Sequence, residues 1–164
     1  WKVMQEPNKD YSAGLIFANR AVDAASGADE LGRALHARGY AHYLRGEYVE
    51  SIASFQEQID ILAGVSTGDA GEGIANALVR NALSLYGLDR YEEAITVCDE
   101  LINRYGNNDT EPLRGKIGRA LLIKGIAFGE LTNRDEAITA YDEQQRRSAL
   151  RTCSKSVALQ GARV

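Results

Sequence analysis

The chain has 164 residues, of which 45% are hydrophobic and 26% are charged, and its formal net charge is −4. This size and composition fit one globular domain with a sizeable core. The mild acidity argues against a nucleic-acid partner, which would need a concentrated basic face. No apolar run approaches the ~20 residues of a membrane span, so we expect no membrane insertion.

The two cysteines, Cys98 and Cys153, are too few for a disulfide framework and too far apart in sequence for a metal motif. We expect two buried or half-buried thiols, which are compatible with a reducing compartment such as the cytoplasm. The sequence starts at Trp1 and stops at Val164 within a stretch that looks helical. We therefore expect it to be a piece of a longer protein.

The first predicted helix covers residues 11–25, where Tyr11, Leu15, Ala18 and Val22 share one face. Further along the chain, three segments align at a constant step of 43 residues, beginning at Tyr48, Tyr91 and Arg134. Each carries one apolar stripe with a helical period. Matching columns hold Ile52, Ile95 and Ile138; Ser51, Ala94 and Ala137; and Glu57, Glu100 and Glu143.

A second helical stretch precedes each of these segments, over residues 31–44, 74–88 and 117–131. Each stretch has a small residue in the same register: Gly39, Ala82 or Gly125. A small side chain there lets a neighbouring helix approach closely, which gives a packing reason for glycine inside a helix. The predicted order is therefore helix A, short turn, helix B, repeated along the chain.

This pattern resembles the tetratricopeptide repeat family, whose unit is ~34 residues with small and large residues at set columns of two helices. The matching residues are Leu35, Gly39, Tyr48, Ser51 and Phe55 in one repeat, Leu78, Ala82, Leu88, Tyr91 and Ala94 in the next, and Leu121, Gly125, Leu131, Ala137 and Tyr141 in the third. The pattern departs from the family in its longer step, in Cys98 at an aromatic column, and in Arg134 at a tyrosine column.

The resemblance implies an all-α, right-handed α-solenoid of antiparallel helix pairs, with about eight helices in a single domain over residues 1–164. Residues 1–27 would be a partial repeat ending in a B helix, followed by full repeats at 28–65, 70–108 and 110–147. Residues 148–164, with Gly161 in the small-residue column, would be the A helix of a truncated repeat. The extra residues fall in 64–73 and 106–115, so we expect longer loops and lengthened A helices, with Thr110 as an N-cap and Pro112 in the first turn.

In this family, the A helices line a concave groove that usually holds a peptide or helix of a partner protein. Carried over position by position, the resemblance implies a groove that is apolar and aromatic with a few basic groups. Its predicted residues are Arg33, His36, Tyr40, Tyr43, Asn76, Val79, Leu83, Tyr86, Arg119, Leu122 and Ile126.

Some family members instead clamp a C-terminal carboxylate with Lys and Asn at set columns of the A helices. Those columns here hold His36, Tyr40, Arg80, Arg119 and Ile123. Two arginines remain but the Asn pair is missing, so the sequence disfavours that role.

The sequence nominates no catalytic residue, cofactor or metal site. His42 falls at a packing column and His36 in the groove, and neither has a ligand partner at metal spacing. The glycine-rich segment 68–73 lacks the strand and the Lys-Ser or Lys-Thr of a phosphate loop, so we expect a loop between repeats. We predict a non-enzymatic protein-interaction module. Two alternatives stay open: an architectural segment that self-associates into a homo-oligomer, and a regulatory arm of a larger enzyme or signalling protein.

Overall fold

The fold is built entirely from helices in the part of the chain that the structure describes. The computed structural model describes residues 11–65, 68–108, 110–131 and 134–161. Residues 1–10 and 162–164 of the predicted terminal repeats lie outside it. Its helices are α1 (Ser12–Ala24), α2 (Ala28–Arg45), α3 (Tyr48–Ala63), α4 (Gly68–Gly87), α5 (Tyr91–Tyr105), α6 (Glu111–Glu130) and α7 (Arg134–Gly161).

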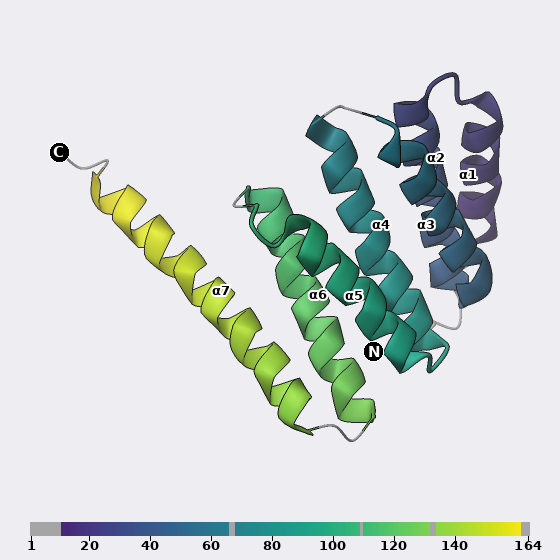
Figure 1. Ribbon diagram of the computed structural model, residues 1–164. Helices are drawn as coiled ribbons and strands as arrows, with labels where there is room; N and C mark the ends of the chain where they lie inside the picture. Colours follow the sequence, from purple (N-terminus) through teal and green to yellow (C-terminus); the bar gives the residue numbers. More distant parts are fainter. Residues whose placement is uncertain (1–10, 66–67, 109, 132–133, 162–164) are drawn as a thin grey trace.

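The helices pack in chain order, each against the next, to form an extended array (Figure 1). In addition, α2 contacts α4 and α4 contacts α6, so the three predicted A helices form a continuous row. Among the described residues, α1, α3, α5 and α7 make no comparable contacts with one another. This arrangement confirms the TPR-like α-solenoid predicted from the sequence, because each helix pair buries its apolar face against its neighbours.

The turn inside the first full helix pair is two residues long and depends on a glycine. Gly46 ends α2 with a φ of 76°, and its N–H bonds back to the carbonyl of Tyr43. Glycine adopts this left-handed backbone without the steric cost that a side chain would add. Glu47 then leads into α3, and its side chain accepts from His42 at 2.7 Å and from Arg45 at 2.8 Å. The tight turn keeps α2 and α3 in direct contact.

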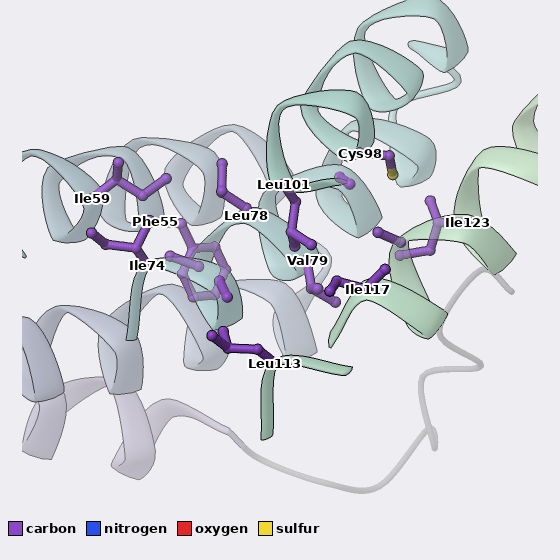
Figure 2. Close-up of a cluster of buried hydrophobic side chains, with 14 of the residues drawn as sticks. Phe55, Ile59, Ile74, Leu78, Val79, Cys98, Leu101, Leu113, Ile117 and Ile123 are labelled. Carbon is purple, nitrogen blue, oxygen red and sulfur yellow. The ribbon is translucent and has the colours of Figure 1, made fainter. Parts of the chain in front are cut away.

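The buried core runs through α3, α4, α5 and α6 (Figure 2). It contains Phe55 from α3, Leu78 from α4, Leu101 from α5 and Ile117 from α6, all almost fully enclosed. Buried hydrogen bonds also join α2, α3 and α4. The Ser51 hydroxyl of α3 donates to the Gly39 carbonyl of α2 and lies 3.0 Å from the hydroxyl of Ser84 in α4. These contacts fix α4 at the centre of the array.

The loop predicted for residues 68–73 is wrong, because these residues form the first turns of α4. Packing overrides the low helix propensity of the three glycines here. Ala70 and Ile74 are buried, and a Cβ atom on Gly73 would lie 2.7 Å from Leu62. The predicted lengthening of the A helices is confirmed for α4 and α6, which have 20 residues each. Thr110 does precede α6, but its side chain makes no capping hydrogen bond.

A separate helix over residues 149–164 is also not observed, because α7 continues without a break from Arg134 to Gly161. Neither glycine nor proline occurs in this helix before Gly161, so nothing in the backbone chemistry ends it near residue 148. The other junctions between predicted repeats contain Gly64 and Gly68, or Gly106 and Pro112. The described residues therefore contain seven helices rather than about eight.

Candidate groove and pocket

A pocket of about 350 Å³ opens on the row formed by α2, α4 and α6. All three helices contribute to it, so it exists only because successive pairs stack. Its lining residues are Tyr43, Arg80, Leu83, Tyr86, Arg119, Leu122, Ile123 and Ile126. Six of these belong to the groove predicted from the sequence, and Arg80 and Ile123 do not. A pocket of this volume is at the small end of ligand sites in proteins.

The remaining predicted groove residues occupy three different environments. Arg33 is exposed and Asn76 is half-buried, both outside the pocket. Tyr40 is 38% exposed and its ring stacks on that of Tyr43, at a centroid distance of 6.4 Å. Val79, in contrast, is 2% exposed and belongs to the core cluster. We therefore remove Val79 from the candidate site, because its side chain offers no surface to a ligand.

His36 is half-buried and is held by neighbouring side chains. Its Nδ1 lies 3.2 Å from Oε1 of Gln58, and its ring packs 5.6 Å from the ring of Phe55. Burial lowers the pKa of His36, and the nearby cations Arg80 and Lys116 lower it further, against a raising contribution from Gln58. The imidazole is therefore neutral at pH 7 and serves as a polar packing residue beside the groove.

Cations gather along the middle of the A-helix row. The guanidinium of Arg80 lies 4.5 Å from the ring centroid of Tyr40, which is cation–π geometry. Burial lowers the pKa of Lys116; Glu72 opposes this effect, whereas the charges of Arg119 and Arg80 add to it. Three cations from α4 and α6 are thus within electrostatic reach of one another, and Glu72 is the carboxylate that faces Lys116.

Two tyrosines form the polar rim of the pocket. The hydroxyl of Tyr86 donates to Glu130 of α6 at 2.9 Å, which ties α4 to α6 at the pocket edge. Burial and this bond raise the pKa of Tyr86 to about 12. The ring of Tyr86 also packs 5.3 Å from that of Tyr91, and burial raises the pKa of Tyr43. Both phenols are therefore protonated at neutral pH, and Tyr86 is a fixed wall.

The sequence missed Arg80 and Ile123 as groove residues although it placed both on A helices. Arg80 follows Val79, and Ile123 follows Leu122, so each lies about 100° around the helix from a residue that was chosen. Aligning the repeats by their spacing predicts which face of a helix lines the groove. It does not predict which of two adjacent residues on that face enters a pocket. The alternative columns weighed for carboxylate binding did contain both residues.

The described residues hold no group of three or more His, Cys, Asp or Glu side chains that could bind a metal ion. Burial raises the pKa of Cys98 to about 12, so its thiol is protonated and a poor nucleophile at neutral pH. The side chain of Cys153 lies outside the described residues. Within the described part of the chain, no helix has the length and apolarity needed to cross a membrane.

Comparison with known proteins supports the repeat architecture. Residues 76–108, which include most of α4 and all of α5, match the family model "Tetratricopeptide repeat". The match omits the first turns of α4, which is where the extra length of this repeat lies. No curated protein matches the chain. Repeats of this family are typically non-catalytic scaffolds and indicate a protein–protein interaction module. The matched repeat and the stacked helix pairs show that residues 76–108 resemble one tetratricopeptide repeat within a TPR-like α-solenoid.

Proposed function

We propose that this chain binds a peptide or helix of a partner protein in the groove formed by α2, α4 and α6, with the pocket as its anchor point. The observation that carries the proposal is the pocket itself, which combines apolar walls with tyrosine edges on the exposed side of three stacked helices. Large apolar side chains that enter such pockets contribute most of the binding free energy in many interfaces. Tyrosine adds contact area at a low cost in side-chain entropy.

A pair of substitutions in the pocket wall tests this proposal. Leu83 and Leu122 are half-buried and line the pocket from α4 and α6, so Leu83→Ala with Leu122→Ala should widen it without emptying the core. Tyr86 is less suitable, because its hydroxyl bonds Glu130 and its ring packs on Tyr91. The matched control is Val49→Ala with Ile138→Ala, two exposed apolar residues on α3 and α7.

The measurement is selection from a displayed library of random peptides, followed by fluorescence anisotropy on the selected sequences. We expect binders whose affinity falls by about tenfold or more in the pocket variant and is unchanged in the control variant, because anchor residues dominate such interfaces. Circular dichroism melting would verify that both variants keep their helices. Failure to select any binder, or equal binding to both variants, would show that the pocket does not anchor a peptide.

A second candidate function, self-association, is favoured by one separate observation. Ile16 and Phe17 on α1 are 58% and 67% exposed, which is unusual for adjacent large apolar residues at the end of a helical array. Stacking of α1 on another copy would cover them. Sedimentation velocity over a range of protein concentrations tests this candidate with Phe17→Ser as the variant. A mass that rises with concentration in the original chain alone would support it.

A further inference from the structure

The pocket has two chemically different parts, which narrows the kind of ligand it can hold. Leu83, Leu122 and Ile126 supply apolar wall, whereas Arg80 and Arg119 bring two guanidinium groups to the same cavity from α4 and α6. A purely apolar anchor would leave both cations next to desolvated surface with no counter-charge. Partial desolvation of a cation is costly unless an anion accompanies it.

These two arginines differ from several other arginines of the described residues. Arg38, Arg90, Arg104, Arg114 and Arg147 each pair with a glutamate at distances of 2.5 to 3.3 Å. Neither Arg80 nor Arg119 forms an ion pair with a carboxylate of the described residues. This holds although the chain has 23 acidic residues against 19 lysines and arginines. The pocket thus holds two arginines whose charges no carboxylate of the described residues neutralises.

The nearby acidic groups are already engaged elsewhere. Glu130 accepts a hydrogen bond from the hydroxyl of Tyr86, and the charge of Glu72 acts on Lys116. Lys116, Arg80 and Arg119 repel one another, and an anionic ligand would relieve that repulsion as it binds. The stack of Arg80 on Tyr40 occupies one face of the guanidinium, while donors in the plane of the group stay available to a carboxylate.

We propose that the partner segment carries acidic side chains next to one large apolar side chain, and that it binds as an internal segment rather than through its C-terminus. The apolar side chain fills the pocket between Leu83 and Leu122, and the flanking carboxylates bind Arg80 and Arg119. This inference rests on the proposed function and adds the charge of the partner to it. The pocket volume of about 350 Å³ suits one such side chain, so the flanking residues of the segment lie outside it, along the A-helix row.

Four synthetic probes separate the parts of this proposal. The first is a peptide with one tryptophan between two pairs of glutamates and with both ends blocked. The second replaces the glutamates by glutamines, and the third replaces the tryptophan by alanine. The fourth is the glutamine peptide with a free C-terminal carboxylate directly after the tryptophan. Anisotropy titrations at two salt concentrations give the affinity of each probe and its dependence on ionic strength.

We expect the blocked glutamate probe to bind at least about tenfold more tightly than the glutamine and alanine probes, with an affinity that falls as salt is added. Arg80→Gln with Arg119→Gln should reduce its affinity to that of the glutamine probe. The single variant Arg119→Gln, at an exposed residue, should give part of this loss without affecting stability. Arg20→Gln with Arg104→Gln, two exposed arginines on α1 and α5, changes the net charge equally and should have no effect.

The inference is overturned if the glutamate and glutamine probes bind equally, if no probe binds, or if the preference for glutamate persists without Arg80 and Arg119. Binding of the fourth probe alone would show recognition of a C-terminal carboxylate and would overturn it too. Equal binding of both blocked tryptophan probes, lost in the Leu83→Ala and Leu122→Ala variant, would leave the proposed function standing. Failure of the library selection as well would overturn both.

Discussion

The first and second full helix pairs meet the same packing problem with different pairs of side chains. Where α2 crosses α3, the column of small residues holds Gly39 and the opposite column holds Phe55, and a Cβ atom on Gly39 would lie 2.9 Å from the phenyl ring. In α4 and α5 the same columns hold Ala82 and Cys98, both fully buried. The third pair follows the first, because a Cβ atom on Gly125 would lie 2.8 Å from the ring of Tyr141.

This comparison gives a physical reason for the departure at Cys98. A larger residue on the A helix accompanies a smaller one on the B helix, so the combined volume of the two columns changes less than the volume of the aromatic column alone. Close packing in protein interiors makes such compensation necessary. The second pair therefore remains a regular member of the repeat array although it lacks the aromatic residue.

The largest expected effect comes from removing the aromatic side chain of the first pair. Phe55→Ala should lower the free energy of unfolding by about 3–5 kcal/mol, since it deletes a fully enclosed ring and leaves a cavity beside Gly39. Cys98→Ala removes a single heavy atom and should cost only about 1 kcal/mol. Urea denaturation followed by circular dichroism measures both. If both variants lost a similar free energy of unfolding, the aromatic residue of the first pair would contribute no more to stability than the cysteine of the second pair.

A smaller effect on stability is expected when the alanine and cysteine of the second pair are introduced at the matching positions of the first pair. Gly39→Ala should destabilise the original chain by about 1–3 kcal/mol, because its Cβ atom overlaps the Phe55 ring. In a Phe55→Cys background the overlap is gone, and the same change should stabilise by about 0.5–1 kcal/mol through helix propensity. A double-mutant cycle in urea reveals this change of sign. Equal costs in both backgrounds would mean that the two columns are not coupled.

The smallest expected effect concerns a third column, which holds Arg38, Asn81 and Lys124. Arg38 bonds Ser54 and Glu57 of α3, and Lys124 bonds Asp99 of α5. The buried Oδ1 of Asn81, in contrast, has no hydrogen-bond partner among the described residues. Asn81→Leu keeps a similar shape and removes this unsatisfied oxygen, so it should stabilise the chain by about 1 kcal/mol.

The melting temperatures of the Asn81→Leu and Arg38→Leu variants, compared with that of the original chain, test this prediction. The arginine variant loses its bonds to α3 and should melt at a lower temperature, whereas the asparagine variant should melt at a higher one. A lower melting temperature for Asn81→Leu would indicate that the asparagine amide contributes to packing in the second pair.

The sequence predicts the fold well because apolar and small residues recur in matching columns, and each column has a structural counterpart. Gly39 and Gly125 do face rings, as expected for positions of close helix approach. Local propensity was the weaker guide. Gly68 and Gly73 suggest a loop, yet both lie in α4, where Gly73 packs against Leu62. No glycine or proline separates 148–161 from the helix before it.

The candidate site was predictable only in outline, for a geometric reason. Spacing along the chain places Val79 and Arg80 on adjacent rows of one helix, but the packing of α4 against α2 and α6 decides which one reaches the pocket. Such packing between helices has no signature in the sequence of a single helix. Six residues of the predicted groove line the pocket from α2, α4 and α6, whereas the predicted residue Val79 lies in the core and its neighbour Arg80 lines the pocket.

The central position of α4 has a consequence for local opening of the molecule. This helix contacts α2, α3, α5 and α6, so its amides can exchange with solvent only after several neighbouring contacts break. In a stacked array each repeat is stabilised by its neighbours, so deuterium uptake should be slower in α4 than in α1, which contacts only α2 among the described helices. Arg80, Leu83 and Tyr86 all lie on α4. The α4 wall of the pocket thus lies on the segment expected to open least often, so a ligand would meet this wall already formed.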